Sequence, residues 1–160
     1  MDWYDESEIK DDFQRAESIL GSGIFEPGNA GHPLFKSAFI ELLICLRDLM
    51  YKAAEYATPI DFTDDVTIQG KVKDVSSLIK YVRDALCHVD SNNHYIDAGM
   101  KASFNVQFGR GRMKVGALEQ VNPYPDDTCF FFGTQRIYLK RHVLRAFDEA
   151  RNGLSPLIHR

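Results

Sequence analysis

The apolar residues in the first part of the chain recur with the spacing of amphipathic helices. One apolar face over residues 2–20 is formed by Trp3, Ile9, Phe13, Ala16 and Leu20. The Gly-Ser-Gly sequence that follows predicts the end of this first helix. Residues 34–57 form a second helical pattern, which stops before a Thr-Pro sequence and carries apolar side chains on more than one stripe. This breadth predicts a central, most buried helix.

A third helix is predicted over residues 66–90, where a Ser-Asn-Asn sequence then breaks the pattern. Its apolar positions, separated by three and four residues in turn, are Val72, Val75, Ile79, Val82, Leu86 and Val89. Such a seam suits packing along another helix. A short basic fourth helix is predicted over residues 139–152, with Gly153 as its C-terminal cap.

Between the third and fourth helices the apolar period changes from helical to alternating. Residues 103–108 and 112–115 alternate, and Gly109-Arg110-Gly111 between them predicts a hairpin turn. Residues 128–132 and 136–139 predict further strands, after a loop at 122–127. The expected fold class is mainly α: a four- to five-helix bundle with a small antiparallel β insertion at about residues 101–138, within a single domain of residues 1–160.

The composition is that of a folded domain, with 160 residues of which 44% are apolar and 26% charged. The richest apolar run, residues 38–50, is broken by three charged residues, whereas a membrane span needs roughly 20 apolar residues. The acidic N-terminus is unlike a secretory signal, so we expect a cytoplasmic protein. Cys45, Cys87 and Cys129 are too widely spaced for a zinc ribbon or a disulfide framework, and we expect no metal or cofactor.

Charge is unevenly distributed along the chain. Residues 1–20 hold seven acidic and two basic residues, a net charge of −5. Residues 136–151 hold five basic and two acidic residues, a net charge of +3. The total of −4 therefore hides a basic second half, which favours an anionic partner.

The end of the third predicted helix combines Arg83, Asp84 and His88. A guanidinium can hold a phosphate bidentately, and an imidazole can transfer protons near neutral pH. Asp84 and His88 are four residues apart, close enough on a helix for the carboxylate to orient the imidazole. These groups could cleave RNA without a metal. The ribose 2′-hydroxyl would attack the phosphate, His88 would act as general base or acid, and Arg83 would stabilise the transition state.

The spacing alone is not specific. Arg136 and His142 give a second match to the same pattern, which we attribute to chance because it begins in a predicted strand. Arg83, Asp84 and His88 also fit a plain surface ion pair followed by a histidine at a helix end.

The motif R-D-A-L-C-H at residues 83–88, ending the third helix of a helical domain of this size, resembles the HEPN superfamily of all-α ribonucleases and nucleotide-binding proteins. Its members share R-x(4–6)-H, commonly with Asn, Asp or His directly after the arginine. The resemblance implies a bundle over about residues 1–95 and 139–152, and a homodimer whose two motifs face one cleft as a composite, metal-independent RNase site. It also implies a place in toxin–antitoxin, antiphage or RNA-processing systems, with an antitoxin or a small nucleotidyltransferase as partner.

Basic residues in the predicted insertion offer a further RNA contact. Arg110, Arg112 and Lys114 lie on or beside the predicted hairpin, with Phe104 and Phe108 nearby. Basic and aromatic side chains together suit phosphate contacts and base stacking, although a solvated hairpin with one apolar face explains them too. Two other functions stay open: a non-catalytic HEPN-like module that binds nucleotide or protein, and a helical protein that pairs through the 72–89 seam.

Overall fold

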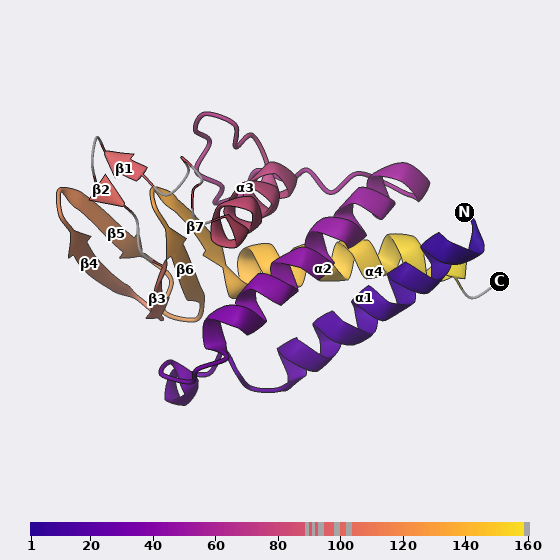
Figure 1. The fold of residues 1–160 in the computed structure, drawn as a ribbon, viewed down its shortest axis with the longest axis horizontal. Coiled ribbons are helices and arrows are strands. Elements are labelled where there is room, and N and C mark those ends of the chain that lie inside the picture. Colours follow the sequence, from indigo (N-terminus) through magenta and orange to yellow (C-terminus); the bar gives the residue numbers. More distant parts are fainter. Residues whose placement is uncertain (89, 91, 93–94, 98–99, 102–103, 159–160) are drawn as a thin grey trace. The chain divides into compact units, whose positions relative to one another are not determined.

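The computed structural model describes residues 1–88, 90, 92, 95–97, 100–101 and 104–158, and is shown in Figure 1. The chain forms two compact units. The first comprises Met1–Phe62 together with Arg145–Arg160, and the second comprises Thr63–Leu144. The second unit is thus inserted in sequence between two parts of the first.

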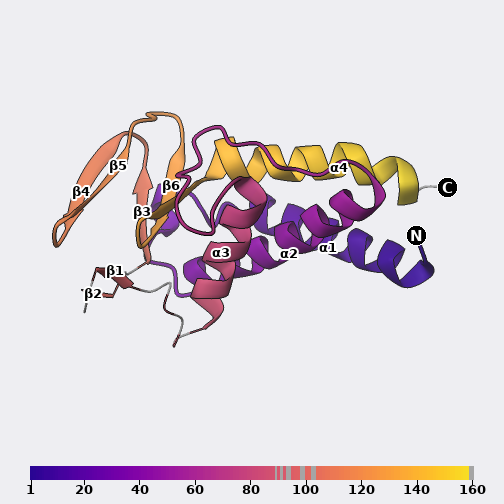
Figure 2. The same ribbon diagram turned by 90° about the horizontal axis from the view of Figure 1, so that it is seen from above.

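The first unit is helical. It contains α1 (Trp3–Gly21), the short 3₁₀ turn η1 (Pro27–Asn29), α2 (Phe35–Tyr56) and α4 (Arg145–Ile158). In Figures 1 and 2 the three long helices lie side by side, and α2 contacts both α1 and α4. The broad apolar surface of α2 is buried as predicted, including Phe39, Leu42, Leu43, Leu46 and Leu49.

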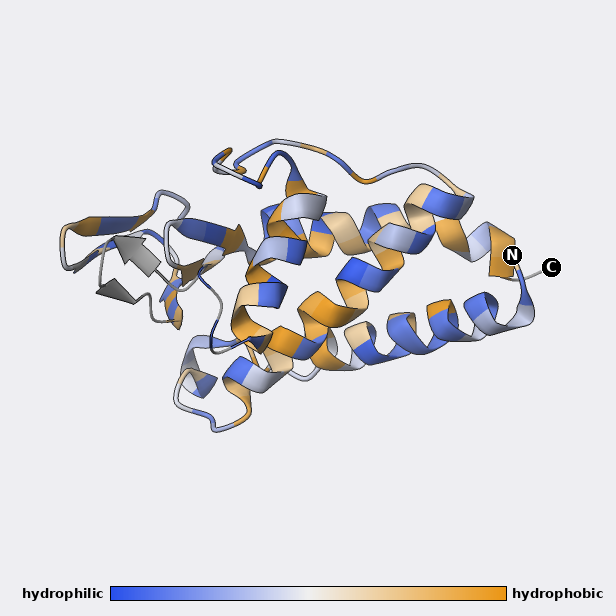
Figure 3. Ribbon diagram, turned by 45° about the horizontal axis from the view of Figure 1, so that its top comes forward, coloured by the Kyte–Doolittle hydropathy of each residue, from blue (hydrophilic) through white to orange (hydrophobic). Residues whose placement is uncertain are grey.

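Aromatic pairs connect the helices of this unit. Phe13 of α1 meets Phe147 of α4 edge to face, with ring centroids 5.7 Å apart. Trp3, which the periodicity placed on the buried face of α1, is instead 80% exposed. It lies in the first turn of α1, directly after the N-cap residue Asp2, and the first buried residue of this helix is Ile9. The side of α1 seen in Figure 3 is largely hydrophilic.

The fourth helix is longer than predicted, because Gly153 does not end it. The helix continues to Ile158 and includes Pro156. A Cβ at Gly153 would lie 3.2 Å from the Cβ of Ala57, so the glycine permits close approach to the segment that follows α2. Close packing, not capping, is therefore the structural role of this glycine.

The second unit begins with irregular chain and then α3 (Val75–Cys87), which starts nine residues later than predicted. Asp74 and Ser77 form a reciprocal capping box that sets this start. Before it, Gln69 and Val72 form an isolated antiparallel bridge around Gly70, whose φ is +58°. Val72 is buried, but it lies in this loop and so is not part of the predicted helical seam. Val89, the last residue of the predicted seam, lies outside the described residues.

Seven strands follow α3 in the described part of this unit. They are β1 (Tyr95–Asp97), β2 (Met100–Lys101), β3 (Phe104–Phe108), β4 (Gly111–Val115), β5 (Leu118–Asn122), β6 (Thr128–Phe132) and β7 (Gln135–Tyr138). They pair antiparallel as β1–β2, β3–β6–β7 and β4–β5. The chain is therefore of mixed α/β class, and the expectation of a mainly α bundle with a small insertion was wrong. One of the four α-helices, α3, shares its unit with these strands and contacts β7.

The predicted hairpin between residues 103–108 and 112–115 was also wrong. Phe108 pairs with Thr128, and Gly111 pairs with Asn122. The consecutive strands β3 and β4 therefore do not pair with each other: β3 pairs with β6, and β4 pairs with β5. The buried Asn122 stabilises the bend, because its side-chain amide donates to the carbonyl oxygens of Gly109 (2.9 Å) and Asp127 (2.8 Å). The true hairpin turn follows β4, at Gly116, where φ is +62°.

A π-helical turn, η3 (Leu139–Leu144), connects β7 to α4. The buried carboxylate of Asp127 accepts the backbone N–H groups of Lys140 (2.8 Å) and Arg141 (3.1 Å) and pairs with the Arg141 guanidinium (3.0 Å). Asp127 thus satisfies amides that an uncapped helical start would leave unpaired. Among the described helices, none combines the length and the apolar character needed to cross a membrane.

Candidate functional site

The predicted catalytic arginine lies in the last two turns of α3. The Nη1 atom of Arg83 is 2.8 Å from Oδ1 of Asp84, and the arginine side chain is 21% exposed. Its Nε atom is buried without a hydrogen-bond partner among the described residues. Five N–H donors are available on a guanidinium, so a single ion pair to Asp84 leaves donors for an incoming phosphate.

His88 is the C-cap of α3 and is exposed. Its backbone N–H donates to the carbonyl oxygen of Asp84 at 3.2 Å, while its own φ of −117° and ψ of 105° leave the helical region. The helix therefore ends at the histidine, and the side chain is presented beyond the last turn. The structure brings Arg83, Asp84 and His88 to the same end of one helix; orientation of the imidazole by Asp84 stays a prediction.

The three basic residues of the predicted RNA surface lie in the same unit but on another element. Arg112 and Lys114 alternate along β4 and are exposed, with Arg112 69% exposed and 3.3 Å from Glu119 on β5. Arg110 lies at the bend between β3 and β4, where its Nε donates to the carbonyl oxygen of Pro123 at 3.0 Å. It is thus at the opposite end of β4 from the hairpin turn.

Phe104, one of the two aromatic residues near these basic residues in sequence, takes part in sheet packing. Phe104 is half-buried and its ring stacks on Phe130 of the neighbouring strand β6, with centroids 6.2 Å apart. Base stacking needs a free ring face. The basic side chains on β4 are therefore the stronger part of the predicted RNA surface.

The second motif match, Arg136 and His142, is structural. His142 is fully buried, its Nδ1 accepts the backbone N–H of Tyr138 (3.2 Å), and its Nε2 lies 3.1 Å from the carbonyl oxygen of Asp64. These two contacts require the neutral tautomer with the proton on Nε2. Burial lowers the pKa of His142, which the contact with Asp64 opposes. A histidine held in this way cannot serve as an accessible acid or base.

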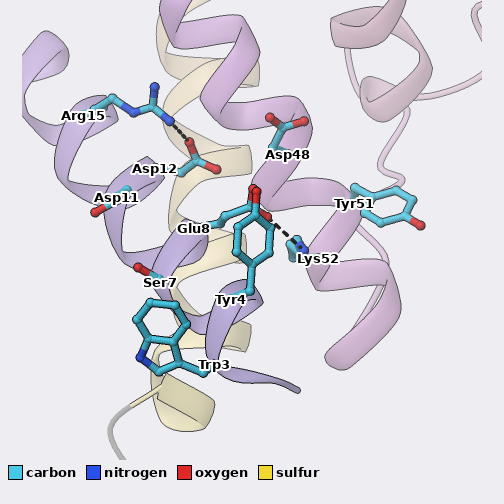
Figure 4. A pocket seen from close by; sticks show the side chains of 10 residues that line it. All are labelled: Trp3, Tyr4, Ser7, Glu8, Asp11, Asp12, Arg15, Asp48, Tyr51 and Lys52. Atoms are coloured by element: carbon cyan, nitrogen blue, oxygen red, sulfur yellow. Dashed lines mark hydrogen bonds and ion pairs between the residues drawn. The ribbon is translucent and has the colours of Figure 1, made fainter.

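A pocket that the sequence did not reveal lies in the first unit, between α1 and α2 (Figure 4). Its volume is about 560 Å³, and it is lined by Trp3, Tyr4, Ser7, Glu8, Asp11, Asp12, Arg15, Asp48, Tyr51 and Lys52. The acidic N-terminus was visible in the sequence but is equally explained by favourable charge near a helix N-terminus. What the sequence lacked was the exposure of the aromatic residues beside those acids.

Within the described residues, no group of three or more His, Cys, Asp or Glu side chains is arranged to hold a metal ion. The sequence matches no protein-family model, and no curated protein or solved structure was found to be similar. The resemblance to the HEPN superfamily therefore rests on the motif at residues 83–88 and its place at the end of a helix.

Proposed function

We propose that this protein is a metal-independent endoribonuclease of HEPN type, with Arg83 and His88 as its catalytic residues. The observation that carries the proposal is the end of α3, where an arginine held by a neighbouring carboxylate is followed by an exposed C-cap histidine. The first group suits a phosphate and the second suits proton transfer, and neither requires a bound ion.

The chemistry balances with these groups alone. The ribose 2′-oxygen bonds to phosphorus while the bond from phosphorus to the 5′-oxygen breaks, leaving a 2′,3′-cyclic phosphate and a 5′-hydroxyl. His88 removes the proton from the 2′-hydroxyl, and an imidazolium protonates the departing 5′-oxygen. Arg83 stabilises the negative charge that accumulates on the phosphoryl oxygens in the transition state.

Two imidazoles are most simply supplied by two copies of the chain. In this arrangement each copy contributes one Arg83 and one His88 to a shared cleft, as the resemblance implies. Cys87 provides a native probe, because it is exposed beside His88 whereas Cys45 and Cys129 are buried. A short bismaleimide should crosslink two copies through Cys87, and Cys87→Ser should abolish the crosslink. Dimers that form without crosslinking would place the interface elsewhere.

The charge of the second unit supports an anionic substrate. Thr63–Leu144 contains 11 basic and 9 acidic residues, a net charge of +2 in a chain whose total is −4. The exposed Arg112 and Lys114 belong to this unit. We propose that they contact the RNA backbone, which carries one negative charge per nucleotide.

The deciding experiment is RNA cleavage by the purified full chain in excess EDTA. The wild type, His88→Ala and the adjacent control Cys87→Ser are compared, and product ends are analysed for 2′,3′-cyclic phosphate. General acid–base catalysis contributes about 10²–10⁴-fold, so His88→Ala should lower the rate by at least a hundredfold while Cys87→Ser keeps it. Equal cleavage by wild type and His88→Ala would overturn the proposal.

If the wild type binds RNA or a nucleotide but cleaves neither, the same residues define the non-catalytic binding module. In that case Arg83→Ala should weaken binding more than His88→Ala does, because a permanently charged guanidinium supplies most of the attraction to a phosphate. This outcome separates the two functions without a change of site.

A further inference from the structure

The pocket between α1 and α2 has an aromatic border that the fold does not require. Trp3 is 80% exposed, Tyr4 62% and Tyr51 65%, and these are three of the six large apolar side chains that are strongly exposed among the described residues. All three line the same pocket. In Figure 4 Trp3 lies at one end of the labelled residues, Tyr4 lies next to Glu8 in their middle, and Tyr51 extends from α2. A gathering of this kind on one surface indicates an interaction site.

The basic groups of the pocket are already engaged by acids. Lys52 is only 13% exposed and pairs with both Asp5 and Glu8 (3.3 Å to the latter). Arg15 pairs with Asp12 at 2.7 Å and Glu41 at 3.0 Å. Asp5 and Glu41 lie outside the lining, and they add negative charge around the pocket to that of the lining residues.

The acids of the pocket exceed its basic groups. The lining contains four carboxylates and two cations. Asp11 is exposed, and no hydrogen bond or ion pair to its side chain is found within the described part of the chain. The unit as a whole carries 14 acidic and 8 basic residues, a net charge of −6. A field of this sign attracts cations and repels phosphates.

We propose that this pocket binds a basic segment of a partner polypeptide. Arginine or lysine side chains of that segment would pair with Asp11, and would stack their cationic groups on the rings of Trp3 and Tyr4. Cations are attracted to aromatic faces, most strongly to that of tryptophan. The pocket belongs to the first unit, whereas α3 belongs to the second, and its partner is recognised by opposite charge.

Nucleic acid and a second copy fit this surface less well. RNA would bring phosphates to a net negative pocket. A second copy would bring another helical unit of net charge −6 to this surface, so like charges would face each other. A separate polypeptide of opposite charge meets neither difficulty.

Trp3 makes the test direct, because it is the one tryptophan in the sequence. The full chain is titrated with a peptide of alternating arginine and alanine, which has no aromatic residue. Trp3 emission should shift to the blue and saturate as the indole becomes covered. A peptide of alternating glutamate and alanine should leave the emission unchanged.

Variants then locate the binding surface, with fluorescence anisotropy of the labelled basic peptide as the readout. Combining Trp3→Ala with Asp11→Asn should weaken binding by about tenfold or more, since a cation–π contact and a charge are both lost. The matched control combines Leu34→Ala and Asp61→Asn, which change an exposed apolar and an exposed acidic residue of the same unit outside the pocket. The control should bind as the wild type does.

Three results would overturn the proposal. The first is an unchanged Trp3 emission at saturating basic peptide. The second is equal weakening by the pocket and control variants, which would show attraction to net charge only. The third is a change in oligomeric state caused by Trp3→Ala in sedimentation, which would make the surface a contact between copies of this chain.

Discussion

Two helices of this protein carry the same Arg-Asp dipeptide in different surroundings. In α2 the Nη1 of Arg47 is 3.2 Å from Asp48, and in α3 the Nη1 of Arg83 is 2.8 Å from Asp84. Both arginines also have a buried Nε without a partner among the described residues. Five residues later the two helices differ: α2 has Lys52, held by acids, whereas α3 has the exposed His88.

The units that contain these two helices differ in net charge. The first unit, called the helical unit below, has a net charge of −6, and the second, called the mixed unit because it holds α3 and the strands, has a net charge of +2. An adjacent arginine and aspartate on a helix is therefore only a local ion pair, of little energetic weight at a surface. What distinguishes α3 is an exposed histidine after the pair and a net positive charge on its unit.

The matched arginines give the largest expected effect. Arg83→Ala should lower RNA cleavage by about a hundredfold or more, because it removes charge stabilisation of the transition state. Arg47→Ala removes an equivalent ion pair and should leave cleavage unchanged. Initial rates in EDTA, normalised to the folded fraction from circular dichroism, provide the measurement. A similar loss in both variants would mean that Arg83 acts only on the fold.

Stability in the helical unit should decrease as pH rises, because of Asp12. Burial raises the pKa of Asp12 to about 6 from 3.8, against the opposing influence of Arg15. A folded-state pKa above the unfolded value stabilises the fold below pH 4, and this contribution is lost as pH rises to 6. The loss is at most about 3 kcal/mol. Between about pH 4 and pH 6, the free energy of unfolding measured with urea should decrease less for Asp12→Asn than for the exposed control Asp11→Asn. The same decrease with pH in both variants would refute the role of Asp12.

The mixed unit should respond to pH in the opposite sense, through His142. Burial lowers the pKa of this imidazole, because the charged form is disfavoured away from water. Protonation of Nδ1 would also remove the acceptor for the Tyr138 backbone N–H. Its contribution to stability is present above the unfolded pKa of about 6.5 and is lost as pH falls below it. His142→Gln should cost about 1 kcal/mol at pH 7 and should lose less stability between pH 7 and pH 5 than the wild type. A pH dependence of His142→Gln identical to that of the wild type would contradict this role of His142.

Exposed basic residues of the two units give the smallest effect. Arg112→Ala should weaken RNA binding a few-fold and lower the slope of log affinity against log salt by about one, because one phosphate contact is lost. Lys36→Ala removes an exposed cation from the helical unit and should change neither quantity. Equal weakening of RNA binding by Arg112→Ala and Lys36→Ala would show that RNA binds the two units without preference.

Much of the secondary structure was predictable from the sequence. The predicted bounds of α1 and α2 lie within one residue of those observed, because long apolar periods are local properties of the chain. The strand β5 was missed because its buried positions, Gln120 and Asn122, are polar. Their amides are satisfied by Gly133 and by Gly109 and Asp127, which are distant in sequence.

The candidate catalytic residues were also predictable as residue types, but the pocket was not. The motif at 83–88 needs only a helix end to bring its members together, and that is a short-range property. The pocket needs Trp3 and Tyr4 of α1 beside Tyr51 and Asp48 of α2. Periodicity assigned Trp3 to the buried face, since it cannot tell where a neighbouring helix stops covering that face.

The sequence by itself determined the helices of the first unit, most strand positions and the Arg-Asp-His motif, because each depends on spacing within a few turns or one strand. Only the tertiary structure decided that β3 pairs with β6 and β4 with β5, and that α3 belongs to the unit with the sheets. Backbone donors and acceptors are the same on every strand, so alternation shows that a strand exists without showing its partner. The choice is made by buried groups such as Asn122 and Asp127, whose hydrogen bonds exist only after distant segments have met.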